Sequence, residues 1–315
     1  MSSELGVQTH PVVVHDVSRS FGTVQALRGV SLEVPAHSIY GVLGPNGAGK
    51  TTLFSILTGF ILPNGGTVEV LGTSKLETIR GRLSILPQDA LFQSNIPIID
   101  QLSFFLTLMG WPRSDAEQEV LRVLELVRLD DVVFREAATL SHGMYKRLAL
   151  AQAFLGRPEV IILDEPTAGL DWKSAEGVRE AIRRLQQDAT VLVSSHDLEE
   201  MHELCDHVAI LDKGALVAAG PVESVTGGAY VVRVKFGRTP DEAELEALRS
   251  VPGVSELTAH DDGYELILHS EAAPDDPSAD RIVGAVLQSA MSQGLYPRKL
   301  ERENRLKRLY VSVTK

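Results

Sequence analysis

A short apolar run that breaks into a glycine-rich loop constrains the fold of this chain more than any other feature. The run Ile39–Leu43 leads into Gly44-Pro45-Asn46-Gly47-Ala48-Gly49-Lys50-Thr51, which matches the pattern G-x-x-x-x-G-K-[ST]. The run predicts a buried strand, and a helix is expected to begin at Lys50. A chance glycine-rich turn is the alternative, but it leaves the lysine, the threonine and the preceding strand unexplained.

Such a loop supplies several hydrogen-bond donors to one triphosphate. Glycines let backbone N–H groups wrap around phosphates without Cβ clashes, and the following helix points its positive end at the same anion. Lys50 is placed to reach the β- and γ-phosphates, and the Thr51 hydroxyl to bind Mg²⁺. We therefore expect ATP and Mg²⁺ as cofactors, with ATP held by Gly44, Pro45, Asn46, Gly47, Ala48, Gly49, Lys50, Thr51 and Thr52.

An acidic pair, Asp164-Glu165, follows the continuous apolar run Val160–Leu163. The run is typical of a central parallel strand that is buried on both faces. Asp164 is placed to hold Mg²⁺, and Glu165 to act as a catalytic acceptor that polarises the attacking water. Alone, the pair would be better explained as a cap on the next helix, but beside a phosphate-binding loop the catalytic interpretation is favoured.

The remaining motifs resemble those of the ATP-binding cassette family, and the resemblance spans roughly residues 12–222. The segment Leu140-Ser141-His142-Gly143-Met144 is similar to that family's signature, usually Leu-Ser-Gly-Gly-Gln, and lies shortly before the acidic pair. Four further matches are Phe21, Gln88 in Leu86-Pro87-Gln88, the loop Ala168-Gly169-Leu170-Asp171, and His196 in Ser194-Ser195-His196-Asp197. Each alone would be an ordinary residue, but their common order makes the resemblance specific.

The resemblance implies a role for each matched residue. Phe21 would stack on adenine, Gln88 would sense Mg²⁺ and the membrane partner, and His196 would contact the γ-phosphate and help position water. Ser141 and the Gly143 backbone would bind the γ-phosphate held by the loop of a second nucleotide-binding domain. The chain has one copy of each motif, so the resemblance implies a dimer with another copy or with a homologous subunit.

Two departures from the family pattern affect these expectations. His142 and Met144 replace the usual glycine and glutamine of the signature, but exporters of drugs, antibiotics or polysaccharides often have a Gly-Met pair here, so activity is expected to survive. Trp172 follows Asp171 where proline is common. It is expected either to pack at the dimer interface or simply to pack at a helix start.

The expected function is that of an ATPase subunit that powers transport, with export favoured, through a separate membrane permease. One alternative is a cassette ATPase of translation or DNA repair, but the net charge of −12 and pI of about 5.2 disfavour nucleic-acid binding. Another is a nucleotide-controlled interaction protein with little turnover, which the retained Glu165 and His196 disfavour. No apolar run approaches the roughly 20 residues that cross a bilayer, and no signal peptide is recognisable. The chain is expected at the cytoplasmic face of the membrane, bound to its permease.

The permease is expected to dock beside Asp89–Ile99, because the resemblance places a coupling helix of the permease there. This segment follows Gln88 and contains Leu91, Phe92, Ile96 and Ile98. The alternative is that these side chains close the local core.

Two domains are expected, an α/β ATP-binding domain with a helical subdomain over residues 1–226 and a small α+β accessory domain over 227–315. In the first, strands are expected at Pro11–Val17, Val30–Val34, Val191–Val193 and Val208–Leu211, with helical structure from Ile98 to Val133 interrupted at Trp111-Pro112. In the second, the order β-α-β-β-α-β suggests a ferredoxin-like domain. Its elements are expected at Tyr230–Phe236, Asp241–Val251, Val254–Thr258, Tyr264–Leu268, Asp280–Gln293 and Leu309–Val313.

Overall fold

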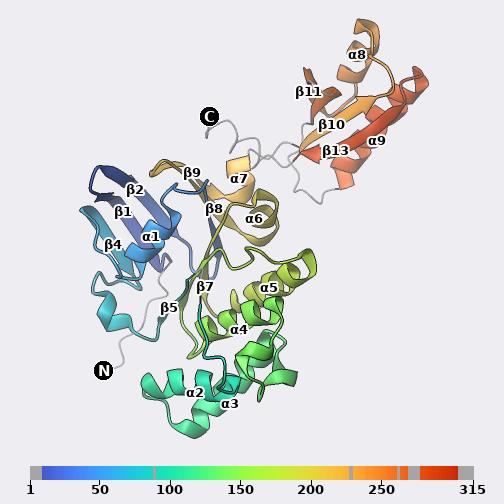
Figure 1. Cartoon of the computed structure of the whole chain (residues 1–315). Helices are drawn as coiled ribbons and strands as arrows, with labels where there is room; N and C mark the ends of the chain where they lie inside the picture. The colour runs from blue at the N-terminus through green and yellow to red at the C-terminus, as the bar shows by residue number, and fades with distance from the viewer. Residues whose placement is uncertain (1–8, 88–89, 227–229, 261–262, 269–276, 304–315) are drawn as a thin grey trace. The chain divides into compact units, whose positions relative to one another are not determined.

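The computed structural model describes residues 9–87, 90–226, 230–260, 263–268 and 277–303, and its strands form three β-sheets. The chain divides into two compact units, Met1–Ala219 and Gly220–Lys315 (Figure 1). The domain limit predicted between residues 226 and 227 stays a prediction. None of the helices within the described residues is long and apolar enough to cross a membrane.

A six-stranded sheet with the order β5-β6-β7-β3-β8-β9 forms the centre of the first unit. Its strands are β5 (Leu83–Leu86), β6 (Val160–Asp164), β7 (Thr190–Ser195), β3 (Ile39–Leu43), β8 (His207–Asp212) and β9 (Ala215–Pro221). The pairs from β5 to β8 are all parallel, and every residue of β3, β6 and β7 is buried. Because parallel strands end at the same edge, the segments that follow β3, β6 and β7 lie together.

A three-stranded antiparallel sheet, with the order β2-β1-β4, packs beside this centre. Its strands are β1 (Val12–Phe21), β2 (Val24–Val34) and β4 (Gly65–Val70). The helix α1 (Lys50–Leu57) lies between the two sheets, because its buried face shares one apolar core with β1, β2, β4 and one face of the six-stranded sheet (Figure 1). The phosphate-loop motif therefore leads into a helix that is buried between two sheets.

A helical segment is inserted between β5 and β6. It contains α2 (Ile98–Leu108), α3 (Arg113–Leu126), α4 (His142–Phe154) and the short 3₁₀ helices Asp130–Val132 and Ala137–Thr139. The interruption predicted at Trp111-Pro112 is confirmed, since α2 ends at Leu108 and Pro112 is the N-cap of α3. The helices α5 (Trp172–Leu185) and α6 (Leu198–Leu204) follow β6 and β7 and pack against the central sheet. A further 3₁₀ helix covers Leu76–Ile79.

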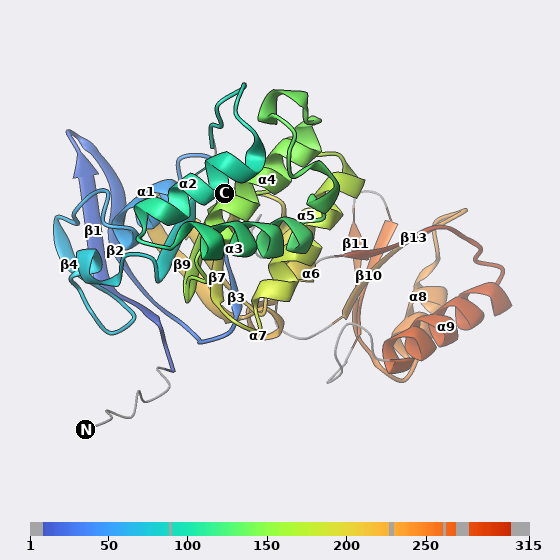
Figure 2. The ribbon, with the colours of Figure 1, turned by 90° about the horizontal axis from the view of Figure 1, so that it is seen from below.

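The second unit begins with β9's last residues and α7 (Val222–Thr226) and then follows the order β-α-β-β-α-β. The elements are β10 (Tyr230–Phe236), α8 (Glu242–Arg249), β11 (Val254–His260), β12 (Gly263–Leu268), α9 (Pro277–Ser292) and β13 (Pro297–Glu303). The sheet has the order β11-β12-β10-β13, and α8 and α9 cover one of its faces (Figures 1 and 2). Val232, Val234 and Phe236 of β10 point into the core that these helices close.

Several elements differ from the sequence-based expectations. The strands β4, β5 and β9 were not predicted, and β1 and β2 extend further toward their hairpin than expected. The last described strand is β13 at Pro297–Glu303, whereas the strand predicted at Leu309–Val313 lies outside the described residues. The polar strand β13 pairs antiparallel with β10, and in this pairing Arg233 lies opposite Glu301 and Val234 opposite Leu300.

Candidate functional site

The glycine-rich loop between β3 and α1 is built around close backbone approaches. A Cβ atom on Gly44 would lie 2.5 Å from the carbonyl oxygen of Leu211. One on Gly49, which has a φ of +107°, would lie 2.6 Å from the carbonyl oxygen of Ala26. Only glycine fits both positions without displacing backbone. The loop is therefore fixed between β8 and β2 at the point where it leads into α1.

Lys50, the first residue of α1, brings its ammonium group back over this loop. Its Nζ donates hydrogen bonds to the carbonyl oxygens of Gly44, at 2.8 Å, and Pro45, at 3.3 Å. The same atom lies 3.7 Å from Oε1 of Glu165, and the Lys50 side chain is only 7% exposed. A buried cation is costly unless charged or dipolar partners surround it. The loop thus presents a positive charge that suits an anionic ligand.

Asp164 ends β6 with both carboxylate oxygens engaged. Its Oδ2 accepts a hydrogen bond of 2.9 Å from Thr51 Oγ1, the second residue of α1. Its Oδ1 accepts a short hydrogen bond from the Ser194 hydroxyl on the neighbouring strand β7. A hydroxyl and a carboxylate in contact form the hard oxygen donor set that Mg²⁺ prefers, so these residues fit the ion that the motif predicts.

Glu165 leaves the strand in an unusual conformation, with a φ of +49°. Its N–H group donates a 2.9 Å hydrogen bond to Ser194 Oγ. Its carboxylate lies between two cationic or polar groups, Lys50 on one side and His196 on the other, where Oε2 is 3.4 Å from His196 Nδ1. A non-glycine residue in the left-handed region is uncommon and strained, and at such sites the surrounding contacts hold it in place.

Ser194 is a site residue that the sequence analysis missed. It lies directly opposite Asp164 in the parallel register of β6 and β7. Its hydroxyl donates to Asp164 and accepts from the Glu165 N–H, so one side chain orients both acidic residues. The available signal was a serine at the end of an apolar strand, two residues before His196.

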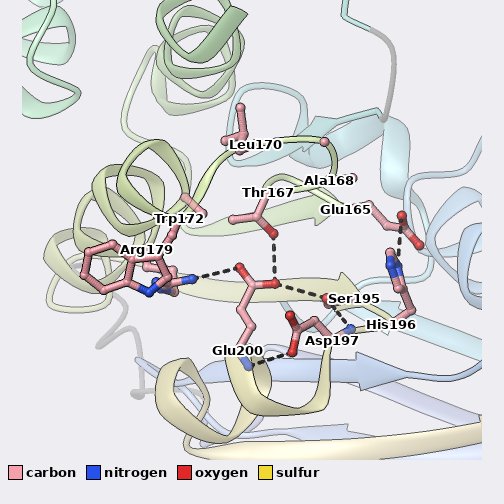
Figure 3. A pocket seen from close by; sticks show the side chains of 12 residues that line it. Glu165, Thr167, Ala168, Leu170, Trp172, Arg179, Ser195, His196, Asp197 and Glu200 are labelled. Carbon is pink, nitrogen blue, oxygen red and sulfur yellow. Dashed lines mark hydrogen bonds and ion pairs between the residues drawn. The ribbon is translucent and has the colours of Figure 1, made fainter.

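A cavity of about 260 Å³ opens beside Glu165 and His196 (Figure 3). One wall is the loop from Thr167 to Leu170, and the opposite wall runs from Ser195 to Asp197 at the end of β7. Trp172, the first residue of α5, borders the cavity and is 77% exposed. Glu200 and Arg179 form its buried floor.

The signature residues lie at the start of α4. Ser141 is the N-cap of this helix, and its Oγ accepts from the N–H of Met144 at 3.3 Å. A Cβ atom on Gly143 would lie 2.6 Å from Ser174 Oγ, so this glycine allows α4 to approach α5 closely. Among the described residues, neither forms a hydrogen bond with the 44–51 loop. Within the part of the chain that the structure describes, the signature and the phosphate loop are therefore not joined by a hydrogen bond.

The other predicted residues differ in how exposed they are. Asn46 is exposed, Ala48 is buried, Thr52 is half-buried in α1, and Gln88 lies outside the described residues. Phe21 ends β1 and is 47% exposed, with the Arg19 guanidinium 4.7 Å from the centre of its ring. An exposed ring at this position is available for stacking.

Comparison with known proteins gives a family match that includes the phosphate loop and the acidic pair. A family model described as ABC transporter matches residues 27–168. The linearmycin resistance ATP-binding protein LnrL of Bacillus subtilis is 28% identical over 95% of this chain and 96% of its own length. The Nod factor export ATP-binding protein I of Burkholderia lata is 34% identical over 67% of this chain and 70% of its own length.

Solved structures share the fold. The structure of cbiO1 from Clostridium perfringens, described as part of the ABC transporter complex cbiONQ, superimposes with a TM-score of 0.64 at 24% identity. The match covers 78% of this chain and 95% of that one. At this level of identity, the likeness establishes a shared fold.

Proposed function

The chain belongs to the ATP-binding proteins of the ABC transporter family, and from this premise we propose that it hydrolyses ATP to drive export through a separate membrane permease. The observation that carries the proposal is the position of Glu165 between Lys50 and His196, directly beside the pair Thr51–Asp164. Export is favoured because a relative that is 34% identical over 67% of this chain is named as an export protein.

ATP binds with its phosphates along the loop. The N–H groups at the start of α1 point toward the anion, and the helix dipole adds to the attraction. The Lys50 ammonium group has three N–H donors and contacts Gly44, Pro45 and Glu165 in this structure. When nucleotide binds, these donors turn to the β- and γ-phosphate oxygens. Phe21 supplies a ring for the adenine.

Thr51 and Asp164 would hold Mg²⁺, together with Gln88. When bound, the ion neutralises charge on the phosphate oxygens as the γ-phosphoryl group transfers. Ser194 keeps the Asp164 carboxylate turned toward Thr51, since it occupies the other carboxylate oxygen. The protein thus orients the Thr51 and Asp164 oxygens before the ion binds.

Glu165 accepts the proton of the attacking water. Its backbone is anchored through Ser194, while its carboxylate remains 15% exposed and open to the cavity side. His196 lies against the same carboxylate with its ring 60% exposed, so it can contact the γ-phosphate from the solvent side. Orientation of the attacking water by a fixed carboxylate is one of the contributions that a protein makes to this step.

A second nucleotide-binding domain completes the site. Ser141 is exposed and Gly143 half-buried at the N-terminus of α4, where backbone N–H groups can receive a phosphate. Among the described residues they form no hydrogen bond with the loop of their own chain, which supports a role toward the γ-phosphate bound by another copy or by a homologous subunit. Trp172 borders the cavity at the adjacent start of α5 and is exposed enough to join that contact.

The permease docks beside the described part of Asp89–Ile99, which begins at Ala90. Hydrogen bonds to the Gln101 side chain fix this segment at Gln93 and Ile96, and Tyr145 fixes it at Phe92. Leu91 remains 85% exposed on this fixed backbone, whereas Ile98 is buried. Each of the two interpretations of this segment thus applies to a different residue. Ile98 closes the local core, and Leu91 is exposed for contact with the permease. Docking there places the chain at the cytoplasmic face of the membrane.

The proposal is tested by expressing the chain with a candidate permease, a multi-span membrane protein sought among the neighbouring genes. The membranes are isolated, and both retention of the chain and ATP hydrolysis are measured with Mg²⁺ and after chelation by EDTA. We expect the chain to co-purify with the membrane protein and to hydrolyse ATP only with Mg²⁺. A chain that neither associates with a membrane protein nor hydrolyses ATP would contradict the proposed function.

A further inference from the structure

A closed ring of contacts connects Glu165 to His196 by a second route, behind the cavity (Figure 3). The direct route is the 3.4 Å contact between Glu165 Oε2 and His196 Nδ1. The second route passes through Glu200 of α6, whose Oε2 accepts hydrogen bonds from Thr167 Oγ1 at 2.8 Å and from Ser195 Oγ at 3.1 Å. Thr167 lies two residues after Glu165, and Ser195 immediately precedes His196.

Both ends of this route are tied to the backbone of the loops that they support. The turn after β6 is closed by the hydrogen bond from the Ala168 N–H to the Glu165 carbonyl, at 3.2 Å, with Thr167 inside it. Ser195 Oγ also accepts a 3.0 Å hydrogen bond from the N–H group of Asp197, so the Ser195 side chain links the residues before and after His196. Movement of either loop therefore strains a bond to Glu200.

Glu200 itself is fixed and buried, with 7% of its surface exposed. Among the residues that the structure describes, its Oε1 has no hydrogen-bond partner, and it lies 3.8 Å from Arg179 Nη1, on a side chain that is equally buried. Burial raises the pKa of Glu200, although the bonds from Thr167 and Ser195 oppose this. A buried carboxylate that is incompletely satisfied is costly to stability, which is consistent with a role in function.

We propose that Glu200 is a positioning residue for hydrolysis, which sets the separation of Glu165 and His196 by holding Thr167 and Ser195 on one carboxylate oxygen. The inference rests on the function proposed above. Glu165 and His196 belong to loops that follow different strands, so the register of β6 and β7 alone leaves their side chains adjustable. A small displacement of a catalytic group costs rate more than it costs binding of substrate, because only the transition state requires the full alignment.

Removal of one bond of the ring tests the proposal. Thr167→Val is similar in shape but lacks the hydroxyl, and Ser195→Ala removes the other bond. In the full chain with its permease, each should lower kcat by about ten-fold or more while the KM and the affinity for a fluorescent ATP analogue stay within about two-fold of the wild type. Thr167→Ser, which keeps the hydroxyl, should restore kcat.

Thr190→Val is the matched control. Thr190 is buried at the start of the same strand β7, and its Oγ1 accepts the His37 N–H at 2.9 Å, far along the strand from His196. Its loss should lower the thermal unfolding temperature without changing kcat. If the wild type hydrolyses ATP and both Thr167→Val and Ser195→Ala retain its kcat, or if they weaken nucleotide binding as much as kcat, the positioning role is overturned. An inactive wild-type chain would instead contradict the proposed function itself and the inference with it.

Discussion

Thr51 Oγ1 donates a 2.9 Å hydrogen bond to Asp164 Oδ2 across 113 residues of sequence. The bond joins the phosphate loop to the acidic pair, the two motifs that carry most of the expected chemistry. The bond is possible because β3 and β6 flank β7 in one parallel sheet and end at the same edge.

Lys50→Ala should weaken ATP binding or turnover at least about ten-fold, since a charge-assisted hydrogen bond contributes roughly 1.5–3 kcal/mol. The test is titration of a fluorescent ATP analogue together with steady-state hydrolysis in the presence of the permease. Lys75→Ala is the control, because Lys75 is exposed on the same unit. Near-normal activity of a folded Lys50→Ala protein would remove the assigned role.

Ser194→Ala should lower stability and raise the Mg²⁺ concentration needed for half-maximal hydrolysis. The change leaves the Glu165 N–H and one Asp164 oxygen without their partner, a loss of about 1–3 kcal/mol for a buried polar group. Thermal unfolding and a Mg²⁺ titration of ATPase activity measure the two effects.

Ser103→Ala is the control for this change, because Ser103 is also buried but its hydroxyl has no hydrogen-bond partner within the described ranges of the chain. That variant should match the wild type in stability and in Mg²⁺ dependence. Equal behaviour of the two serine variants would mean that Ser194 does not orient the acidic pair.

Local pattern was sufficient to predict the centre of the site. The strand predicted at Ile39–Leu43 is β3, residue for residue, and the helix predicted from Lys50 is α1. The apolar run Val160–Leu163 is buried in β6. These segments are readable because a strand that is buried on both faces must be continuously apolar, and a glycine-rich turn follows it.

Features that depend on pairing with distant segments could not be predicted. The edge strand β13 is rich in charged residues, which is common for edges but hides the strand from any apolar pattern. Ser194 and Glu200 gain their contacts only when β6, β7 and α6 come together. Glu200 stands next to Glu199 in a mostly polar helix, so the sequence does not indicate that Glu200 is the buried one.

Cysteine at position 91 or 93 should cross-link to the permease. In a Cys205→Ser background, Leu91→Cys and Gln93→Cys place thiols on an exposed segment whose backbone is fixed by the Gln101 side chain. Leu62→Cys is a control with a comparably exposed side chain, on the connection before β4. Failure of positions 91 and 93 to cross-link in both the ATP-bound and nucleotide-free states, while a thiol elsewhere on the chain succeeds, would exclude this docking site.

Truncation after Gly227 should leave ATP binding intact and change the rate of hydrolysis or the assembly of the complex. The second unit has its own apolar core, and the cluster around α1 contains none of its residues. Dimerisation by sizing, permease binding and ATPase rate are compared with the full chain. Unchanged values for all three would show that the C-terminal unit is a passive extension, and loss of ATP binding would show that the assigned domain limit or site is wrong.

Glu165→Gln isolates the role of Glu165 as proton acceptor, because the amide keeps the size of the side chain but cannot accept a proton. Glu159→Gln is the control, since Glu159 directly precedes β6 at its other end and forms an exposed ion pair with Arg82. The measurement is a single-turnover assay of radiolabelled ATP with Mg²⁺ and the permease, with nucleotide binding measured in parallel. The account predicts that Glu165→Gln binds ATP as tightly as the wild type and hydrolyses it at least about a hundred-fold more slowly, while Glu159→Gln retains the wild-type rate. Hydrolysis by Glu165→Gln at the wild-type rate would contradict it.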